Sequence, residues 1–107
     1  MASSLIIREA DTFFGRLRGL MGKASLPEGE ALMFTPCSSV HTFFMRFAID
    51  VVYLDKERRI VKICEQLKPW RMSLCFGARS VVELNAGKVG ELGWRVGMQP
   101  EEVLKCM

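Results

Sequence analysis

The fold is decided by residues 40–55, which read Val40-His41-Thr42-Phe43-Phe44-Met45-Arg46-Phe47-Ala48-Ile49-Asp50-Val51-Val52-Tyr53-Leu54-Asp55. This is the longest apolar run of the chain, and it holds the only histidine. From Phe47 to Tyr53 most side chains are aromatic or β-branched, which favours a strand over a helix. Both faces of that strand are apolar except at Asp50. We therefore expect a central strand that is covered on both sides.

A carboxylate on such a strand has to be paired, hydrogen-bonded or protonated, because burying it bare is very costly. Arg46 is the basic residue nearest to Asp50 in the sequence, but four residues of extended strand separate the two side chains too far for direct contact. A bend between them, or a basic group from another strand, is expected to neutralise the charge. Two interpretations stay open: Asp50 is a hydrogen-bond hub that fixes a turn or loop, or it lies in a ligand pocket.

Length and composition indicate one globular domain over residues 1–107. Half of the residues are hydrophobic and a quarter are charged, which excludes a disordered chain. The net charge is +3, with 15 basic and 12 acidic residues interleaved along the chain. This distribution lacks the basic patch of a nucleic-acid-binding protein, so no nucleic-acid partner is expected.

No apolar run reaches the ~18 residues of a membrane span, and the apolar run near the start is too short for a signal peptide. We expect a cytoplasmic protein without a membrane partner, monomeric or weakly homo-oligomeric. The cysteines are Cys37, Cys64, Cys75 and Cys106, and no two of them form a Cys-x-x-Cys pair. They are expected to be free thiols in a reducing compartment. Neither a metal nor a cofactor is expected, because one histidine and scattered cysteines do not make a set of three or four ligands.

The rest of the chain alternates short strand patterns with glycine and proline turns. Strands are expected at residues 4–8, 31–34, 47–53, 59–65 and 80–84 with a last edge strand at 102–106, helices at 12–22 and 87–92, a hairpin loop at 55–58, and an extended segment at 66–71. The extended segment is expected because a residue before proline avoids the helical region. The pattern predicts a mainly β fold, a small antiparallel β-sandwich or barrel with one or two short helices.

Six polar or amphipathic side chains accompany these apolar patterns and form the candidate ligand-binding site: His41, Arg46, Asp50, Trp70, Arg71 and Glu83. Trp70 can form an apolar wall with its N–H as a polar handle. Arg46 or Arg71 can hold a carboxylate or phosphate through a bidentate fork. Alternatively the two arginines pair with the two acids and merely tie the sheet together.

Other chemistry is less well supported by the pattern. Cys37 and His41 lie four residues apart, as a thiol and its activating base can, but no third orienting group is identifiable. An enzyme with His41 or Asp50 as acid or base requires a cavity that solvent can reach. An interaction module without a small-molecule site predicts a flat exposed apolar patch that includes Trp94 and Met98.

A family resemblance is carried by five segments of the chain. They are Arg18-Gly19-Leu20-Met21, Leu26-Pro27-Glu28-Gly29-Glu30-Ala31-Leu32-Met33-Phe34, residues 40–55, Pro69-Trp70-Arg71 and Val82-Glu83-Leu84-Asn85-Ala86-Gly87. In this order the chain resembles the domain of unknown function 192 family of bacteria and archaea, from about Thr12 to Gly97. The resemblance implies a compact, mainly β domain and no activity.

The resemblance also implies which polar positions recur: Arg46, Asp50, the region of Pro69, and Glu83. Two departures stand out. Ala31 stands where the family usually has glycine, and Met98 where it usually has an aspartate that serves either a site or a turn. Our first hypothesis is a small β domain that binds a small anionic or polar ligand, or a peptide, in a cleft lined by His41, Arg46, Trp70 and Arg71.

Overall fold

The computed structural model describes residues 5–9 and 26–106. The elements in this part are β1 (Ile6–Glu9), β2 (Glu30–Phe34), β3 (Ser39–His41), β4 (Ile49–Leu54), β5 (Ile60–Leu67), β6 (Met72–Leu74), β7 (Ser80–Asn85), α2 (Lys88–Leu92) and α3 (Glu101–Leu104). The expected mainly β fold with short helices is confirmed. The expected helix at residues 12–22 lies outside the described residues.

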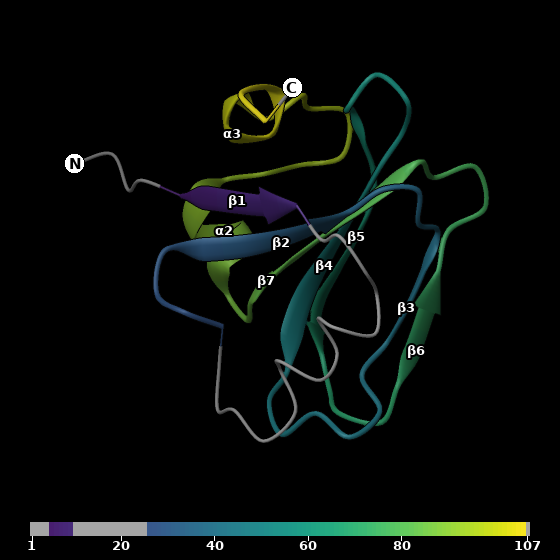
Figure 1. The fold of residues 1–107 in the computed structure, drawn as a ribbon, viewed down its shortest axis with the longest axis vertical. Helices are drawn as coiled ribbons and strands as arrows, with labels where there is room; N and C mark the ends of the chain where they lie inside the picture. Colours follow the sequence, from purple (N-terminus) through teal and green to yellow (C-terminus); the bar gives the residue numbers. More distant parts are fainter. Residues whose placement is uncertain (1–4, 10–25, 107) are drawn as a thin grey trace.

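The strands form an open five-stranded sheet of order β1-β2-β7-β4-β5 and a separate pair, β3 and β6, which we call the ribbon (Figure 1). Strand β4 lies between β7 and β5 and pairs antiparallel with both. All six of its residues are buried, which confirms the strand covered on both sides. It begins at Ile49, two residues later than expected.

Alternate residues of β4 serve two separate cores. Val51 and Tyr53 face one apolar cluster, which the ribbon covers through Val40. Val52 and Leu54 face a second cluster on the other side of the sheet. That second cluster is closed by Val89 of α2, Trp94 and Val103 of α3. Figure 1 shows β3 and β6 side by side and away from α2 and α3. The sheet therefore separates a ribbon side from a helix side.

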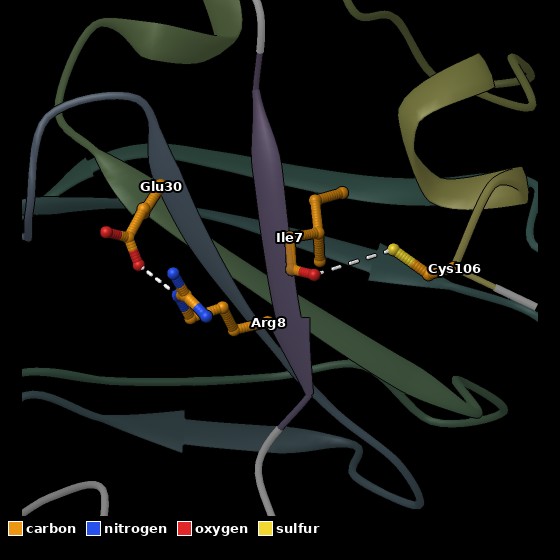
Figure 2. Close-up of polar contacts among 4 residues, drawn as sticks. All are labelled: Ile7, Arg8, Glu30 and Cys106. Carbon is orange, nitrogen blue, oxygen red and sulfur yellow. Dashed lines mark hydrogen bonds and ion pairs between the residues drawn. The ribbon is translucent and has the colours of Figure 1, made fainter.

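Strand β1 pairs parallel with β2, which the antiparallel prediction did not include. The Arg8 side chain forms an ion pair with Glu30 across this pair (Figure 2). On the other side of β1, the Cys106 thiol donates to the Ile7 carbonyl oxygen at 3.7 Å. The edge strand is thus tied to both its neighbour and the end of the chain.

The expected edge strand at residues 102–106 is wrong, because residues 101–104 form helix α3. Pro100 precedes the helix with a φ of −58°, which already suits helical backbone. Glu101 and Glu102 place negative charge in the first turn, where the helix dipole favours it. Val103 is fully buried against the helix side of the sheet. None of the helices in residues 5–9 and 26–106 is both long and apolar enough to cross a bilayer.

The expected extended segment at residues 66–71 is only partly right. Gln66 and Leu67 continue β5, but Trp70 turns into the left-handed region with a φ of 63°. Its backbone N–H donates to the Thr42 carbonyl oxygen at 3.0 Å, which bends the chain back toward the ribbon. The preference for extended backbone applies to Lys68, the residue before Pro69, and does not reach Trp70, whose turn is held by Thr42.

Candidate functional site

Asp50 is fully buried in β4, and its carboxylate accepts hydrogen bonds from backbone N–H groups. Oδ1 accepts a hydrogen bond from the Gln66 N–H at 2.8 Å. Oδ2 accepts from the N–H groups of Gly87 and Val89, both at 3.0 Å. Arg46 is exposed and forms no ion pair with Asp50. The interpretation of Asp50 as a hub that fixes turns is therefore the one the structure supports.

The hub joins two irregular backbone segments. Between the pairs Ile49↔Leu67 and Val51↔Cys64, β5 has one residue more than β4, so Asp50 faces a bulge. Gln66 lies in this bulge with a φ of 54°. The second segment is the start of α2, where an acceptor oxygen satisfies N–H groups that lack partners within the helix. Both carboxylate oxygens are occupied by structural hydrogen bonds.

Glu83 lies on the opposite face of the sheet from Asp50. It pairs with Val51 of β4, whose side chain belongs to the ribbon-side core, whereas Asp50 pairs with Leu84 of the helix-side core. The Glu83 side chain is buried, and its charge contributes to raising the pKa of the Cys37 thiol. The two acids are therefore not members of one site.

The Cys37 thiol is not activated. Burial raises its pKa, and the nearby Glu83 carboxylate raises it further. Its Sγ donates to the Ser39 carbonyl oxygen at 3.1 Å. A nucleophilic cysteine needs the opposite, a lowered pKa that stabilises the thiolate. The spacing between Cys37 and His41 therefore does not correspond to a hydrolase dyad.

Four rings in successive contact lie at one end of the ribbon, and we call them the aromatic cluster: His41, Phe43, Phe44 and Trp70. The centroids of His41 and Phe43 lie 4.8 Å apart, and those of Phe43 and Trp70 lie 5.8 Å apart, both stacked. Phe44 meets Trp70 edge-on at 4.6 Å. Both Phe44 and Trp70 keep more than half of their surface exposed, at 58% and 55%. The cluster is a surface feature and not part of the core.

Thr42 holds the two turns that carry these rings. Its buried hydroxyl donates to the Lys68 carbonyl oxygen at 2.6 Å and accepts from the Arg71 N–H at 2.9 Å. Its carbonyl oxygen accepts from the N–H groups of Trp70 at 3.0 Å and Met45 at 3.2 Å. One residue therefore fixes both turns by side chain and main chain together.

Phe44 and Trp70 both adopt left-handed backbone, with φ values of 68° and 63°. Bulky L-residues avoid this region, at a cost of roughly 1–2 kcal/mol each. Strained residues of this kind persist where the surroundings determine them, and they concentrate at ligand clamps and active sites. The strain marks the aromatic cluster as a functional candidate.

Two arginines lie next to the cluster residues in the sequence. Arg71 follows Trp70 directly, and its Nη1 donates to the Trp70 carbonyl oxygen at 3.3 Å. Arg46 lies two residues beyond Phe44, and both arginines are exposed. Neither guanidinium forms an ion pair within the described part of the chain. Neither arginine therefore ties the sheet together by an ion pair with Asp50 or Glu83, as the alternative interpretation required.

The structure thus divides the six candidate residues. His41 and Trp70 meet through Phe43, with Arg71 beside them and Arg46 close in the chain. Asp50 and Glu83 lie elsewhere, on opposite faces of the sheet. His41 and Asp50 do not form an acid–base pair, because the hydrogen-bond partners of the Asp50 carboxylate are the backbone N–H groups of Gln66, Gly87 and Val89.

Sequence reasoning missed Thr42, Phe43 and Phe44 as members of the candidate site. Their only signal was a polar residue inside an apolar run, followed by two aromatic residues directly before Arg46. The predicted apolar patch at Trp94 is also wrong, since Trp94 is 5% exposed and packs in the helix-side core.

The two positions that depart from the family pattern are structural here. Ala31 is fully buried in β2. Met98 closes a turn, because its N–H donates to the Arg95 carbonyl oxygen at 3.1 Å and its carbonyl oxygen accepts from the Ile60 N–H at 2.8 Å. Its Sδ lies 3.1 Å from the Arg95 nitrogen, a place that an aspartate oxygen can also take.

Two surface hollows lie away from the aromatic cluster. One, of about 170 Å³, is lined by Glu28, Gly29, Glu30, Asn85, Ala86, Lys88 and Glu91. The other, of about 760 Å³, is lined by Asp55, Lys56, Glu57, Gly77, Ala78 and Arg79. Within residues 5–9 and 26–106, no group of three or more histidine, cysteine or acidic side chains is arranged to hold a metal ion.

Comparison with known proteins gives a family match over almost the whole chain. The family described as "Uncharacterized ACR, COG1430", domain of unknown function 192, matches residues 2–101. A UPF0127 protein of Thermococcus sibiricus is 36% identical over 98 residues, which cover 85% of this chain and 62% of that protein. A UPF0127 protein of Pyrococcus horikoshii is 35% identical over 101 residues, covering 89% and 80%. The chain therefore spans less than two thirds of the length of the Thermococcus relative.

Two crystal structures share the fold. A protein of unknown function from Novosphingobium aromaticivorans matches with a TM-score of 0.72 and 22% identity, over 85% of this chain and 70% of that one. A candidate transcription regulator from Sinorhizobium meliloti matches with a TM-score of 0.74 and 22% identity, over 87% and 78%. At this identity the likeness shows the fold alone.

Proposed function

The chain belongs to the domain of unknown function 192 family, and we propose that within this family it is a small β domain that binds an anionic ligand at the aromatic cluster. The observation that carries the proposal is the pair of strained aromatic turns at Phe44 and Trp70, held by Thr42 and flanked by Arg46 and Arg71.

The chemistry of these groups fits a carboxylate or a phosphate. A guanidinium offers a planar fork of donors that matches both anions. Arg46 and Arg71 have no ion-pair partner among the described residues, so their charge is available to a ligand. The exposed rings of Phe44 and Trp70 supply an apolar surface for the part of the ligand that carries the anion.

An enzyme is the weaker alternative. The carboxylate of Asp50 already accepts three backbone hydrogen bonds, and burial disfavours the Cys37 thiolate. An interaction module is a stronger alternative than an enzyme, because the ribbon exposes further apolar side chains beyond the aromatic cluster. We also propose a cytoplasmic location, supported by the free thiols of all four cysteines.

Trp70 provides a direct test, because it is exposed while the other tryptophan, Trp94, is buried. Inorganic pyrophosphate, citrate and a poly-glutamate peptide are titrated while tryptophan emission and the melting temperature are followed. At least one probe is expected to shift the emission and to raise the melting temperature. The double variant Arg46→Ala/Arg71→Ala should weaken that probe at least tenfold.

Arg95→Ala is the matched control, since Arg95 is exposed and follows the buried Trp94 on the helix side of the sheet. It removes one charge without touching the aromatic cluster and should leave the titration unchanged. If none of the three probes moves the emission of the wild-type protein, the proposal fails. Equal loss in Arg95→Ala would reduce the effect to net charge.

A further inference from the structure

The outer face of the ribbon exposes large apolar side chains along its whole length. They are Phe44, Trp70, Met72, Leu74 and Phe76, and Phe76 at the turn after β6 is 93% exposed. Met72 and Leu74 are alternate residues of β6, so their side chains point to the same face of the ribbon, and Trp70 and Phe76 lie in the turns before and after that strand. Apolar side chains gathered in one contiguous patch mark an interaction surface.

The register of the ribbon explains why these side chains face outward. Val40 pairs with Ser73, and Val40 is buried in the ribbon-side core. The neighbouring pairs, Ser39↔Leu74 and His41↔Met72, therefore point away from the core. Figure 1 shows the ribbon at the rim of the molecule, where its outer face is not covered by another described element.

The charge of the two segments that build this face has a single sign. Residues 31–49 and 66–82 contain Arg46, Lys68, Arg71 and Arg79 and no aspartate or glutamate. All four cations are exposed. Because the net charge of the chain is +3, the remainder is close to neutral. The two segments that contain the ribbon therefore carry net positive charge, of which Arg79 also lines a hollow with Asp55 and Glu57.

These features favour one kind of occupant over others. A second copy of this chain docked face to face would bring four cations against four, which repels it. A peptide binds in a groove or pockets, whereas a side chain as exposed as Phe76 protrudes and lines no groove. A lipid surface accepts protruding aromatic and aliphatic side chains at the acyl boundary and attracts arginine and lysine when it is anionic.

We propose that the outer face of the ribbon docks on the surface of an anionic lipid bilayer, with Phe76, Leu74 and Trp70 inserted at the interface. This inference rests on the proposed function, since lipid phosphates are then the anions that Arg46 and Arg71 bind. It differs from the sequence-based expectation of no membrane partner. That expectation considered membrane spans, whereas this face assembles from two segments that meet only in the fold.

The test is vesicle co-sedimentation of the full chain with phosphatidylcholine alone and with mixed phosphatidylcholine and phosphatidylglycerol. Binding to the mixed vesicles is expected to be at least tenfold tighter and to weaken with salt. Trp70 emission should shift to shorter wavelength and be quenched by brominated lipid. Trp70→Phe leaves only the buried Trp94, so the quenching should disappear.

Phe76→Ser and Leu74→Ser should each weaken binding to the mixed vesicles about tenfold, because both side chains are exposed and belong to neither core. Val96→Ser is the matched control, since Val96 is 62% exposed but lies outside the ribbon. Unchanged binding in Val96→Ser and loss in Phe76→Ser support the inference. Equal affinities of these two variants, or equal binding to both vesicle types, overturn it.

The failures of the two proposals are distinguishable. If pyrophosphate, citrate or poly-glutamate binds at Arg46 and Arg71 but the mixed vesicles do not, the membrane inference falls and the proposed function stands. Poly-glutamate binding that is lost in Phe76→Ser, without vesicle binding, assigns the face to an acidic protein partner and overturns the inference. Binding of neither the soluble probes nor the vesicles overturns both.

Discussion

The Oδ2 atom of Asp50 accepts a hydrogen bond from the backbone N–H of Val89 at 3.0 Å, although the two residues are 39 positions apart. The same carboxylate accepts from Gly87 and, through Oδ1, from Gln66. The buried carboxylate therefore accepts hydrogen bonds from peptide N–H groups alone, and these bonds join the start of β4 to the β5 bulge and to the start of α2. The hub stabilises the sheet on its helix side.

Replacing Asp50 by asparagine should destabilise the protein by about 2–4 kcal/mol. Asparagine keeps the shape but directs an NH2 group toward N–H donors, so at least one buried donor loses its acceptor. The free energy of unfolding is measured by urea denaturation. Asp55→Asn is the control, because the half-buried Asp55 also accepts two backbone N–H groups, at 2.8 and 3.0 Å, in the hairpin turn. A loss at Asp50 no greater than that at Asp55 contradicts the hub.

Thr42→Val should cost about 1–3 kcal/mol, because it removes the hydroxyl that bonds Lys68 and Arg71 while leaving the volume unchanged. Thr42→Ser keeps the hydroxyl and should cost less. Since the two turns carry the aromatic cluster, Thr42→Val should also change the emission of the exposed Trp70. Urea denaturation and tryptophan fluorescence measure both effects. If valine and serine behave alike, the hydroxyl does not hold the turns.

Strands whose side chains are buried on both faces could be predicted from the sequence. Strand β4 and its partner β7 were predicted because apolar and β-branched residues fill both of their faces. The prediction of an edge strand at residues 102–106 was wrong because Glu102, Val103 and Leu104 have no clear strand period. The proline before them precedes a helix. Short segments at the chain end are determined by what they pack against.

The candidate site was predictable only in part. Trp70 and His41 are recognisable as amphipathic side chains, but their contact through Phe43 depends on hydrogen bonds that join segments nearly 30 residues apart. Asp50 was recognised as buried, whereas its partners are backbone N–H groups, which carry no residue-type signal. A sequence pattern shows which charge needs compensation and not which peptide groups supply it.

Trp70→Gly should change the free energy of unfolding by no more than about 1 kcal/mol. Glycine relieves the left-handed strain at this position, and that gain offsets the loss of a half-exposed ring. Trp94→Gly is the comparison and should cost more than about 3 kcal/mol, because that ring is buried in the helix-side core. Both are measured by urea denaturation. A large loss at Trp70 would make the ring structural and weaken its assignment to binding.

Ionisation of the Tyr53 hydroxyl should lower the free energy of unfolding at high pH. Tyr53 is the only tyrosine and is fully buried, and its hydroxyl has no hydrogen-bond partner of normal geometry, although the nearby Ser73 offsets part of the effect. Burial raises the pKa of Tyr53, so above the ordinary tyrosine pKa of about 10 the unfolded chain releases a proton that the folded chain retains. Stability is therefore complete below that pH and falls as the pH rises through the folded pKa.

Tyr53→Phe tests this account because it removes the hydroxyl and keeps the ring. It should stabilise the protein at neutral pH by about 1 kcal/mol, since a buried polar group without a partner carries a desolvation cost. It should also flatten the alkaline loss of stability, leaving only the part due to Cys37 and Cys106, whose pKa values burial also raises. Urea denaturation across pH, with tyrosinate absorbance of the wild type, measures both. Destabilisation by phenylalanine would show that the hydroxyl is well bonded in solution.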